Sequence, residues 1–155
     1  RTRPVGGRIR TLTQAALNAD VTVSQHDMTT SITATLLRAA RNLTACLDAE
    51  LQDTGLGVDH WLALDALAAA AGLTMAELQA LTPTPGPTLT RVVDRLVVQA
   101  LAYREVDQFD RRKVRVFLSE RGTLLHDSLR SRIEPVEAQW AAANRRQLSD
   151  RLASP

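Results

Sequence analysis

Apolar positions recur at helical spacing along most of this chain. Steps of three and four residues separate them from 28 to 51, from 59 to 68, and again from 121 to about 144. This spacing places one apolar stripe along a helix. Glycines at 55, 57 and 72 end the first two segments. We therefore expect three main helices, with Asp59 capping the second and Pro135 kinking or dividing the third.

Between the second and third of these helices, the pattern predicts two shorter helices joined by a turn. Thr74 followed by Glu77 is the capping-box signature of a helix over 74–81. Prolines at 83, 85 and 87 cannot continue that helix and predict the turn. A helix over 87–98 follows, with a core-facing stripe formed by Leu89, Val92, Val93 and Leu96.

After residue 99 the period changes and predicts a β-hairpin. Segments 101–106 and 114–118 have the alternation of short strands, and the polar residues 107–113 between them form the tip. The order is therefore helix, turn, helix, hairpin. In a helix-turn-helix the first helix braces the second, which enters the major groove of DNA.

Composition adds little to this picture but excludes some classes. Apolar residues make up 45%, charged residues 23% and aromatic residues 3% of the chain, which is ordinary for a globular protein rich in helix. The net charge is only +2, and Arg supplies all of the basic residues except Lys113. Arg suits phosphate recognition, although GC-rich coding also favours it. No apolar run approaches the roughly 18 residues of a membrane span, no secretory signal is visible, and Cys46 has no partner cysteine, so we expect a cytoplasmic protein.

Two polar surfaces are candidates for contact with DNA. Opposite its apolar stripe, the 87–98 helix presents four side chains that suit bases and phosphates: Thr88, Thr90, Arg91 and Arg95. The hairpin tip adds Asp110, Arg111, Arg112 and Lys113. There, Asp110 could orient one guanidinium while another enters a narrow minor groove. The alternatives are a solvated helix face and a charged turn that protects the strand edges.

These segments resemble the MarR family of bacterial regulators. The resemblance runs from Trp61 through Gly122 and is carried by Met75–Leu78, Thr88–Leu96, the Asp107-Gln-Phe-Asp-Arg-Arg112 wing and the Leu-Ser-Glu-Arg-Gly run that ends at Gly122. It implies a mainly α fold with a small β-wing, a winged helix-turn-helix flanked by N- and C-terminal dimerisation helices. It also implies a homodimer on a pseudo-palindromic site of double-stranded DNA, often released by a small phenolic or other lipophilic effector.

On this basis the chain divides into four parts: a basic N-terminal extension (1–27), an N-terminal dimerisation helix (28–57), a DNA-binding lobe (58–119), and a C-terminal dimerisation helix with its tail (120–155). The family's ligand pocket would lie near Arg38, His60, Trp61 and Trp140, although core and interface packing is the alternative. Cys46 could sense oxidants as in some relatives, but a small buried residue is the simpler interpretation.

Three features depart from the family pattern. The Pro83–Pro87 turn removes backbone N–H groups that could hold phosphate, which puts the target sequence in doubt. Ala100 replaces a frequent Gly before the first wing strand, so that turn is expected to differ. The C-terminal helix looks truncated after Leu152, and the N-terminal extension could replace its missing part.

The sequence thus predicts a ligand-responsive transcriptional regulator, expected to be a repressor. No catalytic motif, cofactor motif or metal-ligand spacing is recognisable, so we expect neither an enzyme nor a metal or cofactor site. Two alternatives remain: a winged-helix module for protein contacts, and an apolar-ligand binding protein with little specific DNA binding.

Overall fold

The computed structural model describes residues 31–153, without the side chains of 146–148 and 150–153. In chain order the elements are α2 (Ile32–Leu51), the 3-10 helix η1 (Gln52–Thr54), α3 (Val58–Ala68), β1 (Leu73–Thr74), α4 (Met75–Leu81), α5 (Gly86–Val98), β2 (Ala102–Val106), β3 (Val114–Leu118) and α6 (Glu120–Ala153). The predicted class, mainly α with a small β-wing in a winged helix-turn-helix, is confirmed. The basic extension 1–27 lies outside the described residues.

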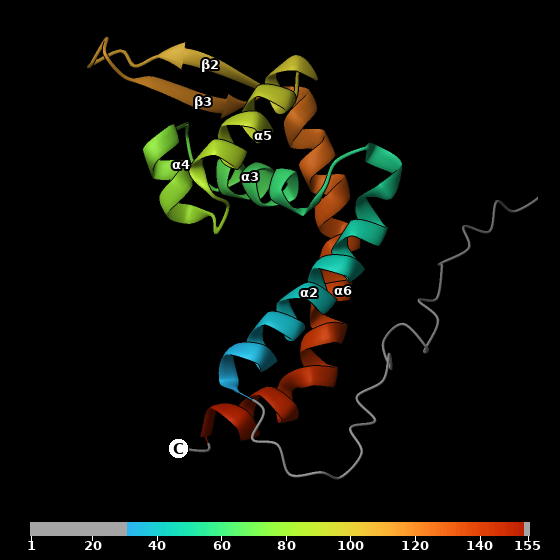
Figure 1. Cartoon of the computed structure of the whole chain (residues 1–155). Helices are drawn as coiled ribbons and strands as arrows, with labels where there is room; N and C mark the ends of the chain where they lie inside the picture. Colours follow the sequence, from blue (N-terminus) through green and yellow to red (C-terminus); the bar gives the residue numbers. More distant parts are fainter. Residues whose placement is uncertain (1–30, 154–155) are drawn as a thin grey trace, which may run out of the picture.

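Two regions are distinguished in Figure 1. The winged lobe, residues 58–119, contains α3, α4, α5 and the sheet. The arm consists of α2 and the C-terminal part of α6, which run antiparallel beside each other. Trp140 Nε1 of α6 donates to Asn42 Oδ1 of α2 over 2.6 Å. Nearer the lobe, Arg132 of α6 donates to the Glu50 carbonyl at the end of α2. No helix of the described part of the chain is long and apolar enough to cross a membrane.

The sheet has three antiparallel strands in the order β1-β3-β2. Ala102 pairs with Leu118 and Val106 with Val114, which sets the register of the wing. The sequence predicts two of these strands, β2 and β3. The third strand, β1, is only two residues long and pairs Leu73 with Val116. A strand of two residues carries no alternation, so the periodicity could not reveal it.

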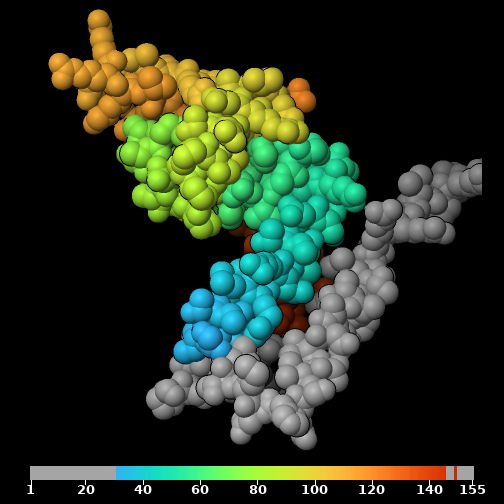
Figure 2. Space-filling view, in the orientation of Figure 1, coloured from blue at the N-terminus to red at the C-terminus, as the bar shows by residue number. Residues whose placement is uncertain are grey.

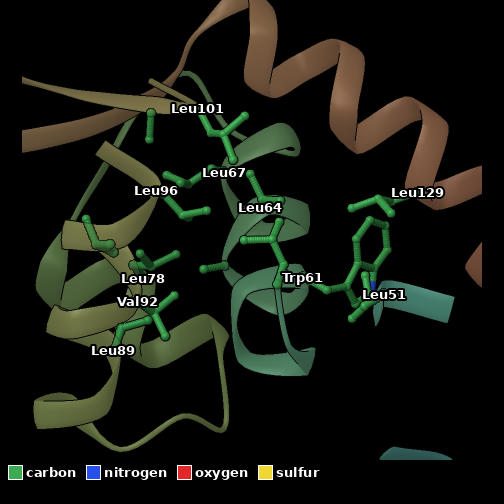
Figure 3. Close-up of a cluster of buried hydrophobic side chains, with 14 of the residues drawn as sticks. Leu51, Trp61, Leu64, Leu67, Leu78, Leu89, Val92, Leu96, Leu101 and Leu129 are labelled. Atoms are coloured by element: carbon green, nitrogen blue, oxygen red, sulfur yellow. The ribbon is translucent and has the colours of Figure 1, made fainter. Parts of the chain in front are cut away.

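The core of the lobe lies between α3, α4, α5 and the sheet (Figure 3). The predicted stripe of α5 is entirely buried in it, together with Leu64, Leu67 and Leu78 from the neighbouring helices. Figure 3 also shows Trp61 on the opposite side of α3, between Leu51 of α2 and Leu129 of α6. Helix α3 therefore packs on the rest of the lobe with one side and on the arm with the other, and it fixes the lobe relative to the arm.

Two expectations about helix ends were wrong. Helix α3 is capped by Gly57 rather than Asp59, because the helix begins two residues earlier, and the backbone N–H of Gly57 donates to His60 Nδ1. Pro135 does not divide α6, which is one helix from Glu120 to Ala153. Pro135 is exposed, whereas Ile133 and Val136 on either side of it are buried. Packing therefore holds the helix through the proline, and water can reach the carbonyl that the proline leaves unpaired.

Candidate nucleic-acid interface

The turn between α4 and α5 is held by its threonines. Thr82 and Thr84 are buried while Pro83 and Pro85 are exposed, as expected where prolines at alternate positions keep a chain extended. Thr82 Oγ1 donates to the Leu78 carbonyl over 3.0 Å, and Thr84 Oγ1 donates to Asp59 Oδ1 over 2.7 Å. Asp59, predicted as a helix cap, thus serves to fasten this turn to α3.

Helix α4 begins at the predicted capping box. The Thr74 hydroxyl accepts the N–H of Glu77 over 3.2 Å, and the Glu77 carboxylate accepts the N–H of Thr74 over 2.8 Å. The Thr74 N–H and, over 2.9 Å, the Thr74 hydroxyl both donate to the Glu77 carboxylate, and these two hydrogen bonds lower the pKa of Glu77. The box fixes the start of the helix that braces α5.

The outward face of α5 divides into anchored and free side chains. Arg95 Nη2 donates to the Gly55 carbonyl over 2.8 Å, Thr90 Oγ1 donates to the Gly86 carbonyl over 3.1 Å, and Asp94 pairs with Arg104 of β2 over 2.7 Å. Thr88 and Arg91 are exposed and form no hydrogen bond or ion pair with the described residues. The face that sequence reasoning treated as uniform therefore has its free polar groups towards its N-terminal half.

The wing is organised around Asp107. Its Oδ1 accepts the N–H groups of Phe109 and Asp110 over 2.8 and 2.9 Å, and its Oδ2 accepts Arg115 Nε over 2.5 Å. These hydrogen bonds, the one from Arg115 foremost, lower the pKa of Asp107 to about 2. The same Arg115 donates to the Gly72 carbonyl over 3.0 Å and lies 3.7 Å from Glu77. The Arg115–Glu77 ion pair thus joins the hairpin to the start of α4.

The predicted role of Asp110 differs from what the structure shows. We expected Asp110 to orient Arg111 or Arg112, but its carboxylate accepts only the backbone N–H of Arg112, over 3.1 Å, and lies 3.6 Å from Lys113 Nζ. The carboxylate that orients a guanidinium is Asp107, because it faces Arg115 across the hairpin. Arg111 and Arg112 are exposed, and their side chains bind none of the described residues. Sequence reasoning missed Asp107, Arg104 and Arg115 as residues that organise this surface, and only Arg115 had a signal, its polar place in the alternation of β3.

The four predicted pocket residues do not form one pocket in the described chain. Trp61 is buried and stacks on His126 with the ring centroids 5.2 Å apart, and His60 accepts the Gly57 N–H over 3.2 Å. Burial, and to a smaller extent the charge of Arg95, lowers the pKa of His60. Trp140 binds Asn42 within the arm and Arg38 is exposed.

A different cleft, of about 400 Å³, lies between α3, β3 and α6. His126 is buried at its floor, with Nε2 3.0 Å from Asp65 Oδ1 and Nδ1 3.3 Å from Asp127 Oδ1. Phe117 and Leu118 line its apolar side. Cys46 is half-buried against the core, away from these residues.

Residues 54–113 match the model of the MarR family. This segment, which runs from the end of η1 through the hairpin tip, is thus similar to the MarR family. Three solved structures superpose on most of the chain, and their low identity shows the fold alone. CouR from Rhodococcus jostii RHA1, bound to p-coumaroyl-CoA, has 23% identity and a TM-score of 0.69, covering 83% of this chain and 93% of its own. S. aureus MepR, in complex with DNA, has 20% identity and a TM-score of 0.68, covering 79% and 93%.

The third is BpsR from Bordetella bronchiseptica, whose DNA binding is regulated by 6-hydroxynicotinic acid. It has 20% identity and a TM-score of 0.68, covering 85% of this chain and all of its own. A comparison with curated proteins finds no match.

Proposed function

We propose that this chain is a ligand-responsive transcriptional repressor of the MarR family that binds a pseudo-palindromic operator as a homodimer. One observation carries the proposal: α5 lies beside a basic wing, and the Arg104–Asp94 ion pair joins the two. On the surface of α5, Thr88 and Arg91 are exposed and bind none of the described residues. Guanidinium and hydroxyl groups presented on a helix and an adjoining wing suit the major groove and the neighbouring minor groove. The proposal includes no enzymatic activity, and it places the protein in the cytoplasm with its DNA.

Exposed apolar side chains on the arm support the homodimer. Ile32, Leu36 and Leu37 of α2 are 46, 44 and 53% exposed, although α2 packs on α6. Ile32 and Leu36 lie one turn apart on the same side of the helix. We propose that a second copy covers them, with 28–57 and 120–155 forming the dimerisation layer and 58–119 the DNA-binding lobe.

The cleft beside His126 supports the response to an effector. It reaches from α3 and β3 of the lobe to the N-terminal part of α6, the helix that continues into the arm, so a bound molecule would act at the joint whose geometry sets the spacing of two recognition helices. Asp65 and Asp127 flank the cleft, whereas its one guanidinium, Arg130, is paired with Glu134 over 2.6 Å. These charges favour a neutral or cationic aromatic effector over an aromatic acid.

The test is binding to a duplex that the full chain selects from a randomised library, titrated over a series of salt concentrations. A specific complex should weaken steeply with salt as counterions are released. The double variant Arg111→Ala/Arg112→Ala should weaken it further. For this variant, the magnitude of the slope of log K against log salt should be smaller by between about 2 and about 4. Each lost phosphate contact removes about 0.9 from the slope, and the dimer loses one or two contacts in each of its two wings.

Arg130→Ala is the matched control, because it removes an exposed guanidinium from α6 and leaves α5 and the wing intact. Its salt slope should equal that of the unchanged protein. If no duplex is enriched, or if both variants lose affinity equally, the proposal fails. The winged fold would then serve protein contacts or the binding of an apolar molecule.

A further inference from the structure

The tip of the wing carries an aromatic side chain that the fold does not use. Phe109 is 99% exposed, the highest exposure among the large apolar residues described. A hollow of about 250 Å³ lies beside it, lined by Val106 and Phe117, yet the ring leaves that hollow unfilled. The turn itself needs only the backbone N–H of residue 109, which any residue except proline supplies. Since neither packing nor turn geometry requires a phenyl ring here, its position points to a partner.

The ring is presented on a braced support. The tip is closed by two backbone hydrogen bonds, from Asp107 N–H to the Lys113 carbonyl over 2.9 Å and from Lys113 N–H to the Asp110 carbonyl over 2.8 Å. The Asp107 carboxylate adds the two hydrogen bonds described above and is itself held by Arg115. A partner that binds Phe109 therefore has little backbone entropy to remove.

The surroundings of the ring select the kind of partner. Arg111, Arg112 and Lys113 follow it within four positions, and all three are exposed. The one carboxylate among them, Asp110, is already occupied by the Arg112 N–H and Lys113. Figures 1 and 2 show that the hairpin projects well beyond the helices of the lobe, so this mixed apolar and cationic tip can enter a groove that the lobe itself cannot. An apolar surface bordered by phosphates is offered by the base steps of a DNA minor groove.

We propose that Phe109 acts as a wedge, which inserts from the minor groove into a base step of the operator while the adjoining cations hold the flanking phosphates. This inference rests on the proposed DNA-binding function and specifies how the wing contributes to it. Because unstacking costs least at pyrimidine–purine steps, the wedge makes such steps preferred beneath each wing, without any hydrogen bond to a base. Phe109 is thus a specificity-determining residue.

The experiment uses the selected duplex with 2-aminopurine placed in turn at each position under the wing. Unchanged protein should brighten the probe at one step on each side of the site, because the fluorescence of 2-aminopurine rises when it unstacks. Phe109→Ala should abolish the brightening and lower the affinity at least about 25-fold, because each lost stack costs at least about fivefold and the dimer carries two wings. Phe109→Leu, which keeps an apolar wedge, should retain part of both signals. Gln108→Ala, its exposed neighbour, is the matched control and should change neither.

The outcomes separate this inference from the function on which it rests. If Arg111→Ala/Arg112→Ala weakens binding but Phe109→Ala leaves affinity and fluorescence unchanged, the DNA-binding function stands and the wedge is overturned. If Phe109→Ala weakens binding while no position brightens in the unchanged protein, the ring touches the groove without entering a step, and the wedge is again overturned. If no duplex binds at all, both proposals fall.

Discussion

The winged lobe and the arm are held together by different means. In the lobe, polar side chains join successive elements: Thr84 to α3, Arg104 to α5, and Arg115 to both the hairpin and α4. In the arm, Arg132 binds the Glu50 carbonyl and Asp53, Trp140 binds Asn42, and part of the apolar face of α2 stays exposed. The polar contacts that join the elements of the lobe are thus made within one chain, whereas Ile32, Leu36 and Leu37 of the arm are the exposed face that the proposed dimer would cover. The two regions therefore differ in what a second copy would add to them.

The largest effect should come from a charge on the exposed face of the arm. Leu36→Asp removes one leucine burial from each protomer of the proposed dimer, and each such burial is worth about 1.5 to 3 kcal/mol. The dimer dissociation constant should therefore rise at least about 100-fold. Analytical ultracentrifugation over a concentration series measures it. Leu81→Asp, a charge on a leucine of α4 that is 62% exposed, is the control and should leave the mass unchanged. A monomer in the unchanged protein would remove the contrast between the two regions.

The next effect tests how tightly the lobe closes onto α6. A Cβ at Gly122 would lie 1.9 Å from the Leu101 carbonyl oxygen, which also accepts the N–H of Ser119 over 3.0 Å. Gly122→Ala must push the wing strand away from α6, and we expect it to cost about 3 kcal/mol of unfolding free energy. Urea unfolding followed by circular dichroism measures the loss.

Gly57→Ala provides the comparison for that glycine. Its Cβ would meet Asp48 Oδ1 at 3.8 Å and His60 Nδ1 at 4.0 Å, both ordinary contacts, and its backbone is extended, so the loss should stay below about 1 kcal/mol. Equal losses in the two variants would show that close approach at Gly122 does not govern the stability of the lobe.

A smaller effect of opposite sign is expected at Ala100. This residue has φ +56°, and it follows α5 in a Schellman motif, in which Leu101 N–H donates to the Leu96 carbonyl and Ala100 N–H to the Val97 carbonyl, both over 2.9 Å. Because a Cβ is strained in this conformation, Ala100→Gly should stabilise the protein by about 1 kcal/mol. Ala69→Gly, at the right-handed end of α3, should destabilise it by roughly 0.5 to 1 kcal/mol. The same urea titration reads both, and a loss in Ala100→Gly would contradict the account.

The helices of the lobe were more predictable from the sequence than the contacts between its polar side chains. The stripe of α5 and the capping box of α4 are local patterns, so spacing alone indicated them. The pairs Arg115–Asp107 and Thr84–Asp59 join residues that only the folded chain brings together, and the sequence offers many equivalent arginines and aspartates. For the same reason the sequence favoured Asp110 for the role that Asp107 has in the structure. Ala100 was noted as unusual, but its positive φ needed the structure.

The smallest effect should appear only in acid and only in the wing. The hydrogen bonds to Asp107 lower its pKa from 3.8 to about 2, so the folded hairpin favours the ionised carboxylate. Its contribution is therefore fully present above about pH 4 and is lost as the pH falls from there towards about 2. Hydrogen exchange of the Phe109 and Asp110 amides should quicken, relative to their intrinsic rates, over that interval while the amides of α3 stay protected. Asp107→Asn keeps an oxygen for the two N–H groups but loses the charge that faces Arg115, so its wing should exchange faster at neutral pH and respond less to acid. An unchanged acid response in this variant would mean that another group holds the wing, and the contrast between a braced lobe and an open arm would then need a different cause.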